Sequence, residues 1–168
     1  ARLILAGYVE AHRDKPPLIL LEYPFAIALR DEETGREFLL RGIIDRVDLA
    51  DDGLVIVDYK TSKRKPSPKQ LNEDLQLTIY TFAANRLFEQ KVRQIIYYHL
   101  RDQTELQVTR SDGAIKVLLR ETLPQVADGI ARERFDPQPG YYCRFCDYRE
   151  ICAEEGGVDL RRYEPREN

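Results

Sequence analysis

Residues 54–59, with the sequence Leu-Val-Ile-Val-Asp-Tyr, constrain the fold more than any other segment, because they are nearly all apolar. A strand of this kind is typical of the centre of a sheet, where both faces are buried. Other strand-like segments rich in β-branched and aromatic residues lie at 18–30, 37–49, 92–100 and 104–109. Helical periodicity predicts helices at 1–13, 70–89 and 111–133. This order predicts an α/β chain with a mixed central sheet flanked by helices.

Two local signals refine this prediction. Asp52-Gly53, between the second and third strands, favours a two-residue type I′ hairpin turn. That turn would place Asp45 opposite Lys60 and diagonal to Asp58. Pro124 is expected to kink the helix at 111–133, because proline removes a backbone donor.

The composition narrows the class of protein. The chain has 168 residues, of which 43% are hydrophobic and 33% charged, which fits one globular domain and excludes collagen, mucins and wholly disordered chains. No apolar run approaches the roughly 20 residues of a membrane span. The net charge of −3 argues weakly against coating nucleic acid through bulk positive charge, but it does not exclude a local basic groove. The chain contains no methionine, so we expect a processed chain or a C-terminal fragment of a larger protein.

Charged side chains close the apolar third strand. Alternate residues of a strand share a face, so Asp58 and Lys60 point one way and Tyr59 the other. Charges at the end of a buried strand need partners or a function, and ligands of α/β proteins collect at such strand ends. With Asp45 about 7–8 Å away across the hairpin, two carboxylates could reach one hard cation such as Mg²⁺. A register shift of one residue would put Asp45 on the wrong face, and Asp48 is expected to be a surface acid on the opposite face.

Three motifs in this order resemble a known family. They are Gly42-x-x-Asp45-Arg46-Val47-Asp48, Asp58-Tyr59-Lys60-Thr61 and Gln76-Leu77-x-x-Tyr80. Together they resemble the RecB-like branch of the PD-(D/E)XK nuclease superfamily, over about residues 20–152. That branch includes nuclease domains of AddAB-type helicase–nucleases and the CRISPR-adaptation exonucleases. The resemblance implies a restriction-endonuclease-like α/β core and one nuclease domain over residues 1–168.

The resemblance also implies roles for the motif residues. Asp45, Asp58 and the Tyr59 carbonyl would bind Mg²⁺ or Mn²⁺, and Lys60 would position or activate the attacking water. Gln76 and Tyr80, one helical turn apart, would lie near the active site and contact the lysine or DNA.

Some candidate residues match the family less well. The alternative for Gln76 and Tyr80 is packing of the helix on the sheet. The family usually carries a metal-binding histidine in an upstream helix, but His12 lies too close to the next strand for an easy match. Glu22 is expected to be a structural acid rather than a metal ligand.

The three cysteines form a local cluster, Cys143-x-x-Cys146-x₅-Cys152, within segment 135–155. This spacing suits thiolate ligation of zinc or an iron–sulfur cluster. The resemblance implies a [4Fe–4S] cluster in the parent protein, with a fourth cysteine upstream that this chain does not contain. The alternatives are a zinc site completed by His12 or His99, and three reduced thiols.

A basic loop follows the candidate catalytic lysine and holds Lys63, Arg64, Lys65 and Lys69. It could contact DNA phosphates, or it could be a solvated loop. No recognition helix or zinc finger is visible, so cleavage without strong sequence preference is expected.

These observations lead to the hypothesis of a Mg²⁺-dependent deoxyribonuclease acting on single-stranded DNA or duplex ends. We expect the exonuclease module of a cytoplasmic DNA-repair helicase–nuclease, with a helicase partner, no membrane association, and weak or absent activity of the isolated piece. The alternatives are a stand-alone CRISPR-adaptation exonuclease, a non-catalytic DNA-binding domain stapled by a cluster, and a hydrolase of small phosphate esters.

Overall fold

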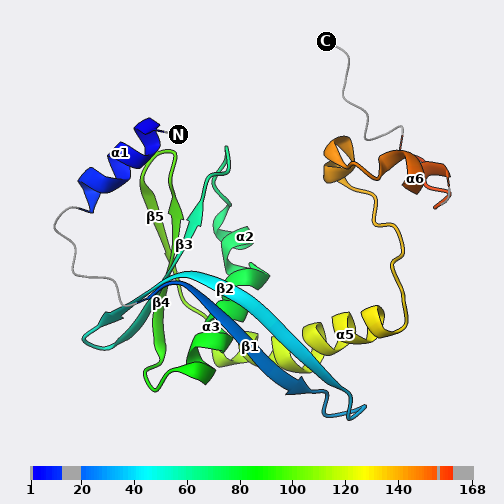
Figure 1. Cartoon of the computed structure of the whole chain (residues 1–168), viewed down its shortest axis with the longest axis horizontal. Helices are drawn as coiled ribbons and strands as arrows, with labels where there is room; N and C mark the ends of the chain where they lie inside the picture. The colour runs from blue at the N-terminus through cyan, green and yellow to red at the C-terminus, as the bar shows by residue number, and fades with distance from the viewer. Residues whose placement is uncertain (1, 13–19, 155, 161–168) are drawn as a thin grey trace. The chain divides into compact units, whose positions relative to one another are not determined.

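The fold is built on one five-stranded sheet, seen in a computed structural model that describes residues 2–12, 20–154 and 156–160 (Figure 1). The strand order is β1-β2-β3-β4-β5, with β3 and β4 parallel and the other neighbours antiparallel. The strands are β1 (Leu20–Arg30), β2 (Glu37–Ala50), β3 (Gly53–Lys60), β4 (Val92–His99) and β5 (Thr104–Val108). The predicted mixed sheet and α/β class are confirmed. The first and last residues of the helix expected at 1–13 and the first two residues of the strand expected from residue 18 lie outside the described residues.

The helices agree in position with the sequence prediction but differ in continuity. They are α1 (Arg2–Ala11), α2 (Pro68–Asn72), α3 (Leu75–Leu87), α4 (Asp112–Val117), the π-helical turn η1 (Leu118–Thr122), α5 (Leu123–Ala131), the 3₁₀ helix η2 (Tyr141–Phe145) and α6 (Arg149–Glu154). The single helix predicted at 70–89 is wrong, because Asp74 begins a new helix by accepting a hydrogen bond from the Leu77 amide at 3.0 Å. The irregularity expected at Pro124 takes the form of η1, which ends just before α5 and its proline.

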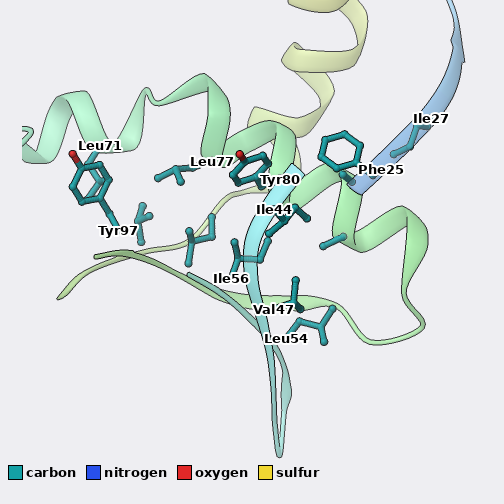
Figure 2. Packing of buried hydrophobic residues seen from close by; sticks show 14 residues of the cluster. Phe25, Ile27, Ile44, Val47, Leu54, Ile56, Leu71, Leu77, Tyr80 and Tyr97 are labelled. Atoms are coloured by element: carbon teal, nitrogen blue, oxygen red, sulfur yellow. The ribbon is translucent and has the colours of Figure 1, made fainter. Parts of the chain in front are cut away.

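The core lies between the sheet and α3, on what we call the α3 face (Figure 2). Side chains such as Phe25, Ile44 and Ile56 pack there against Leu77 and Tyr80 of α3. The opposite face, which we call the α1 face, has a smaller cluster of Val55, Val57 and Tyr98, against which Tyr8 of α1 packs. Strand β3 is buried from Gly53 to Asp58, as expected for a strand covered on both sides.

The β2–β3 turn differs from its prediction and changes the strand register. Ala50 pairs with Gly53, so Asp51 and Asp52 form the turn instead of Asp52-Gly53. Gly53 opens β3 with φ +142°, and a Cβ there would lie 2.5 Å from the Lys91 carbonyl oxygen. Pairing continues to Arg46 and Val57, so the next step places Asp45 opposite Asp58 and not opposite Lys60. The register is shifted by two residues, which leaves every side chain on its predicted face.

Gly42, the first residue of the Gly-x-x-Asp motif, allows close packing of β1 on β2. Gly42 pairs with Phe25, and a Cβ at this position would come within 2.5 Å of the Phe25 ring. This contact gives the motif glycine a packing role on the α3 face.

The chain divides into two compact units, residues 1–124 and 125–168. The first contains the whole sheet, and the second contains η2, α6 and the three cysteines. The expectation of one nuclease domain over 1–168 stays a prediction. Within the part of the chain that the structure describes, no helix has both the length and the apolar character to cross a bilayer.

Candidate active site

Asp58 and Lys60 form an ion pair at the carboxyl end of β3, on the α3 face. The Asp58 side chain is almost completely buried, whereas Lys60 is partly exposed. The Lys60 Nζ donates a hydrogen bond to Asp58 Oδ1 at 3.0 Å and lies 2.7 Å from Oδ2. The second contact brings the charges together, but its angles do not make a hydrogen bond. Oδ2 is therefore a buried carboxylate oxygen without a hydrogen-bond partner.

Asp45 supplies a second carboxylate beside Asp58. Its Oδ2 accepts a hydrogen bond of 2.9 Å from the backbone amide of Tyr59, which lies between Asp58 and Lys60. Burial raises the pKa of Asp58, and the charge of Asp45 raises it further, although the hydrogen bond and charge of Lys60 oppose the shift. The structure thus brings together the two acids that the sequence predicted to share a face.

Helix α3 reaches this pair through two polar side chains. Lys60 Nζ donates to Gln76 Oε1 at 2.7 Å, and Gln76 Nε2 donates to the hydroxyl of Tyr80 at 2.7 Å. Burial is the main cause that raises the pKa of Tyr80, so its hydroxyl is neutral. The residues predicted from i, i+4 spacing therefore form a hydrogen-bonded chain that ends on the lysine.

The charge state of Lys60 limits what it can do chemically. Burial lowers the pKa of Lys60, but the hydrogen bond and charge of Asp58 outweigh burial and the pKa ends above its ordinary value. The side chain is therefore an ammonium ion at neutral pH, suited to donating hydrogen bonds and neutralising negative charge. It is not suited to removing a proton.

The acids fit a small hard cation. Within the described ranges, no three or more His, Cys, Asp or Glu side chains gather into a metal site. Mg²⁺, however, is commonly held by one or two carboxylates together with waters and substrate phosphates. Asp45 and Asp58 match that smaller donor set, and Asp58 Oδ2, which makes an ionic contact with Lys60 but no hydrogen bond, is an oxygen that a cation could bind.

A second polar network lies on the α1 face, directly behind the acids. Arg46 is 5% exposed and binds Asp48 through Nε at 2.8 and 3.0 Å and through Nη2 at 2.7 Å. It also donates to the hydroxyls of Tyr8 and Tyr59, at 3.0 and 3.1 Å, and these two hydroxyls are hydrogen-bonded to each other. Asp48 lies on the face opposite Asp45, as expected, but it is only partly exposed because it pairs with the buried arginine. Strand alternation places Arg46 and Asp48 on one face, but it does not predict that Arg46 is buried.

His12 and Glu22 take positions that the sequence left open. The His12 ring stacks on Tyr8 at 4.0 Å and meets the edge of Tyr98, so it lies on the α1 face, away from Asp58. Glu22 has φ +46° and lies between the pairs Leu21–Arg46 and Tyr23–Ile44, hence opposite Asp45. A left-handed glutamate inside a strand is a strained backbone conformation of the kind found near functional sites.

The four basic residues predicted to bind DNA differ in their surroundings. Lys63 and Arg64 are exposed. Lys69 is also exposed and lies 4.0 Å from Glu73. Lys65 donates to Asp102 at 2.8 Å and to the hydroxyl of Thr104 at 3.3 Å, so a phosphate would have to compete with an existing ion pair.

The cysteines are free thiols in the second unit. Cys146 is exposed, and Cys143 and Cys152 are partly buried. Cys143 Sγ accepts a hydrogen bond from the Gly140 amide at 3.3 Å. Among the described residues these thiols do not form a group of three or more potential metal ligands, and the expected cluster and its zinc alternative stay predictions.

Comparisons with known proteins agree with this geometry. The family model described as PD-(D/E)XK nuclease superfamily matches residues 1–153. The chain is 40% identical over 93 residues to an ATP-dependent helicase/nuclease subunit of Streptococcus sanguinis, covering 54% of this chain and 7% of that protein. It is 29% identical over 119 residues to the same-named subunit of Oceanobacillus iheyensis, covering 67% of this chain and 10% of that protein. The chain thus spans about a tenth or less of these relatives' length.

A solved structure also matches. The crystal structure of SSO0001 superposes with a TM-score of 0.60 at 15% identity, covering 91% of this chain and 68% of that one, which supports the fold alone. The family model, the sheet and the paired acids with their lysine agree, and the chain therefore belongs to the PD-(D/E)XK nuclease superfamily, as a nuclease domain related to ATP-dependent helicase/nuclease subunits.

Proposed function

We propose that this chain is the Mg²⁺- or Mn²⁺-dependent deoxyribonuclease module of a helicase–nuclease that acts in DNA repair. The observation that carries the proposal is the arrangement at Asp58, whose buried carboxylate lies beside Asp45 and is bonded to Lys60. The relatives named as helicase/nuclease subunits support the helicase context, because this chain matches a small part of each. An exonuclease acting on single-stranded DNA or duplex ends fits a site without a sequence-reading element. The cytoplasmic location stays a prediction.

Each site residue has a physical task in this proposal. Asp45 and Asp58, with the Tyr59 carbonyl, would hold the cation, which when bound would supply Lewis-acid neutralisation of charge on the scissile phosphate. The Lys60 ammonium would orient the water nucleophile and balance the charge that develops on the phosphoryl oxygens. Gln76 fixes the position of that ammonium, and Tyr80 fixes Gln76. Lys63, Arg64 and Lys69 would contact neighbouring phosphates without reading bases.

The test compares cleavage of end-labelled linear and circular single-stranded DNA by the full chain, with Mg²⁺ or Mn²⁺. Lys60→Ala should lower the rate about 10²- to 10³-fold and keep Mn²⁺ binding measurable by calorimetry. Asp58→Ala should lose both cleavage and binding. Asp52→Ala is the matched control, since Asp52 is an exposed acid in the turn at the far end of β3. Undiminished cutting by both the Asp58 and the Lys60 variants would refute the proposal, and cutting of circles would exclude a strict exonuclease.

A further inference from the structure

The backbone that follows Lys60 is anchored to the turn between β4 and β5. Three consecutive carbonyls, those of Lys60, Thr61 and Ser62, each accept a hydrogen bond from this region. Their donors are the Leu100 amide at 2.9 Å, Arg101 Nε at 2.7 Å and His99 Nε2 at 2.8 Å. The start of the basic loop is therefore fixed to the strand that pairs with β3.

The hydrogen bond from His99 to Ser62 belongs to a ring of polar contacts that also includes Asp102 and Lys65. The other ring nitrogen of His99 lies 2.7 Å from Asp102 Oδ1, and Asp102 Oδ2 accepts a hydrogen bond from Lys65 at 2.8 Å. The hydrogen bonds from Lys65 and His99 lower the pKa of Asp102, so this residue is a carboxylate. Lys65 thus contacts Asp102 directly, whereas Ser62 is linked to it through His99, which is 3% exposed.

The ring leaves the tip of the loop facing solvent. Lys63 and Arg64 lie between the two anchored positions, and both are exposed. The Ser62 hydroxyl donates to the Arg64 carbonyl at 3.0 Å, which braces the tip from within. A backbone held on both sides limits the positions from which these two cations can reach a phosphate.

We propose that Asp102, acting through His99 and Lys65, is a positioning residue that holds loop 61–65 so that Lys63 and Arg64 meet DNA phosphates beside the scissile bond. This inference rests on the proposed nuclease function and deepens it. Preorganisation strengthens binding because less loop and side-chain freedom is lost when the ligand is bound. Asp102 therefore favours DNA binding although its own charge repels the phosphates.

The charge of Asp102 and its anchoring of the loop have opposite effects on DNA affinity, and this makes the proposal testable. Asp102→Asn removes a negative charge next to the basic loop, so long-range electrostatics alone would tighten DNA binding. Loss of the anchor would loosen the loop and weaken binding. Asp102 lies in a turn with its side chain 46% exposed, so the substitution is expected to leave the sheet folded.

The experiment measures the affinity of the full chain for a dye-labelled oligothymidylate by fluorescence anisotropy, with Ca²⁺ as the cation, together with hydrogen exchange of residues 61–65. Asp102→Asn should raise the Kd about fivefold and speed exchange of these amides about tenfold. Asp102→Glu keeps the carboxylate and should restore binding to within about twofold of the unmodified chain. The matched control is Asp52→Asn, because Asp52 is also an exposed turn acid and pairs with Arg93 of β4 at 2.7 Å, so it should change neither measurement.

Unchanged or tighter DNA binding by Asp102→Asn, or unchanged exchange in the loop, would overturn the proposal. So would an unmodified chain that does not bind the oligonucleotide. Neither measurement needs cleavage, so a chain that binds DNA without cutting it would refute the nuclease function and still decide the role of Asp102.

Discussion

At Asp58, the requirements of folding and of the proposed chemistry conflict. Its carboxylate is fully buried, one of its oxygens lacks a hydrogen bond, and its pKa is raised by burial and by Asp45. For an acid with a raised pKa, folding favours the protonated form. The stability that protonated Asp58 gives to the folded protein is therefore complete below the usual aspartate pKa of about 4. It is lost as the pH rises through the pKa of Asp58 in the folded protein. At neutral pH this raised pKa therefore lowers the stability of the cation-free protein.

We expect Asp58→Asn to stabilise the cation-free chain at neutral pH by about 1 kcal/mol, because it removes a buried charge. The amide keeps an acceptor for Lys60. Thermal unfolding checks this, with Asp52→Asn as the control that should not stabilise. The substitution should also abolish stabilisation by Mn²⁺, and a lower melting temperature for the variant would contradict the interpretation.

The same pKa shift predicts how cation binding depends on pH. The acids must be ionised to bind Mn²⁺, so protons compete with the cation. Because the pKa of Asp58 is raised, affinity should begin to fall at a higher pH than for two ordinary aspartates of pKa about 4. Calorimetric titrations at several pH values measure this. An affinity that stays constant until the pH nears 4 would show that Asp58 is not a ligand.

Among the structural elements, β2 and β3 present different chemistry on their two faces. The candidate site residues Asp45, Asp58 and Lys60 lie on the α3 face. On the α1 face, Arg46 and its partners connect the strands to α1. The buried arginine is satisfied by a carboxylate and two hydroxyls, so each partner depends on the others.

Arg46→Ala should lower the free energy of unfolding by about 3 kcal/mol, because it leaves the partly buried Asp48 without its counter-ion. Asp48→Ala should cost a similar amount, and the double variant clearly less than the sum. Urea unfolding of the three variants gives the coupling energy. Tyr8→Phe is the milder comparison, at about 1 kcal/mol for one hydrogen bond. Additive costs would show that the pair does not interact.

The close approach of β1 and β2 at Gly42 makes a separate prediction. Gly42→Ala should destabilise the sheet by about 1–3 kcal/mol, since the added Cβ would meet the Phe25 ring. Gly113→Ala, in α4, has room for its Cβ and should be neutral or slightly stabilising. Equal stabilities of the two variants in chemical denaturation would remove the packing explanation for the motif glycine.

Sequence patterns predicted the strands and the site acids because alternation is local information. The apolar run at 54–57 fixes β3, and Asp58 and Lys60 follow from it. The register was wrong by two because the preference for Asp-Gly in the turn gave way to Asp51-Asp52. The break at Asp74 carried a capping signal that helical periodicity obscured. The pairing of Asp48 was not predictable, since burial of Arg46 depends on hydroxyls supplied by α1 and β3.

At the scale of the whole molecule, the residues of the nuclease proposal and the cysteine cluster fall in different units. The residues of the nuclease proposal lie within 1–124, and the three cysteines within 125–168. A unit of this size cannot bury a large core and commonly needs a metal or disulfides for stability.

We expect all three thiols of the native chain to react readily with Ellman's reagent, because none is disulfide-bonded and none is fully buried. The same number of reactive thiols should be found in denaturant, which serves as the control. Labelling should leave Mn²⁺-dependent stabilisation unchanged, since the site acids belong to the other unit. Protected thiols, or visible iron–sulfur absorbance that labelling removes, would instead support the cluster.

The strand order has a consequence for how the site forms during folding. Three of the four strand pairings join neighbours through short antiparallel connections, whereas β3 and β4 are parallel and need the crossover through α2 and α3. Long closures cost more chain entropy and form later than hairpins. The β2–β3 hairpin alone brings Asp45 to Asp58, but Gln76 and His99 reach Lys60 and Ser62 only when the crossover closes. We therefore expect the acids to assemble early in folding, and the groups that orient the lysine and the basic loop to join them last.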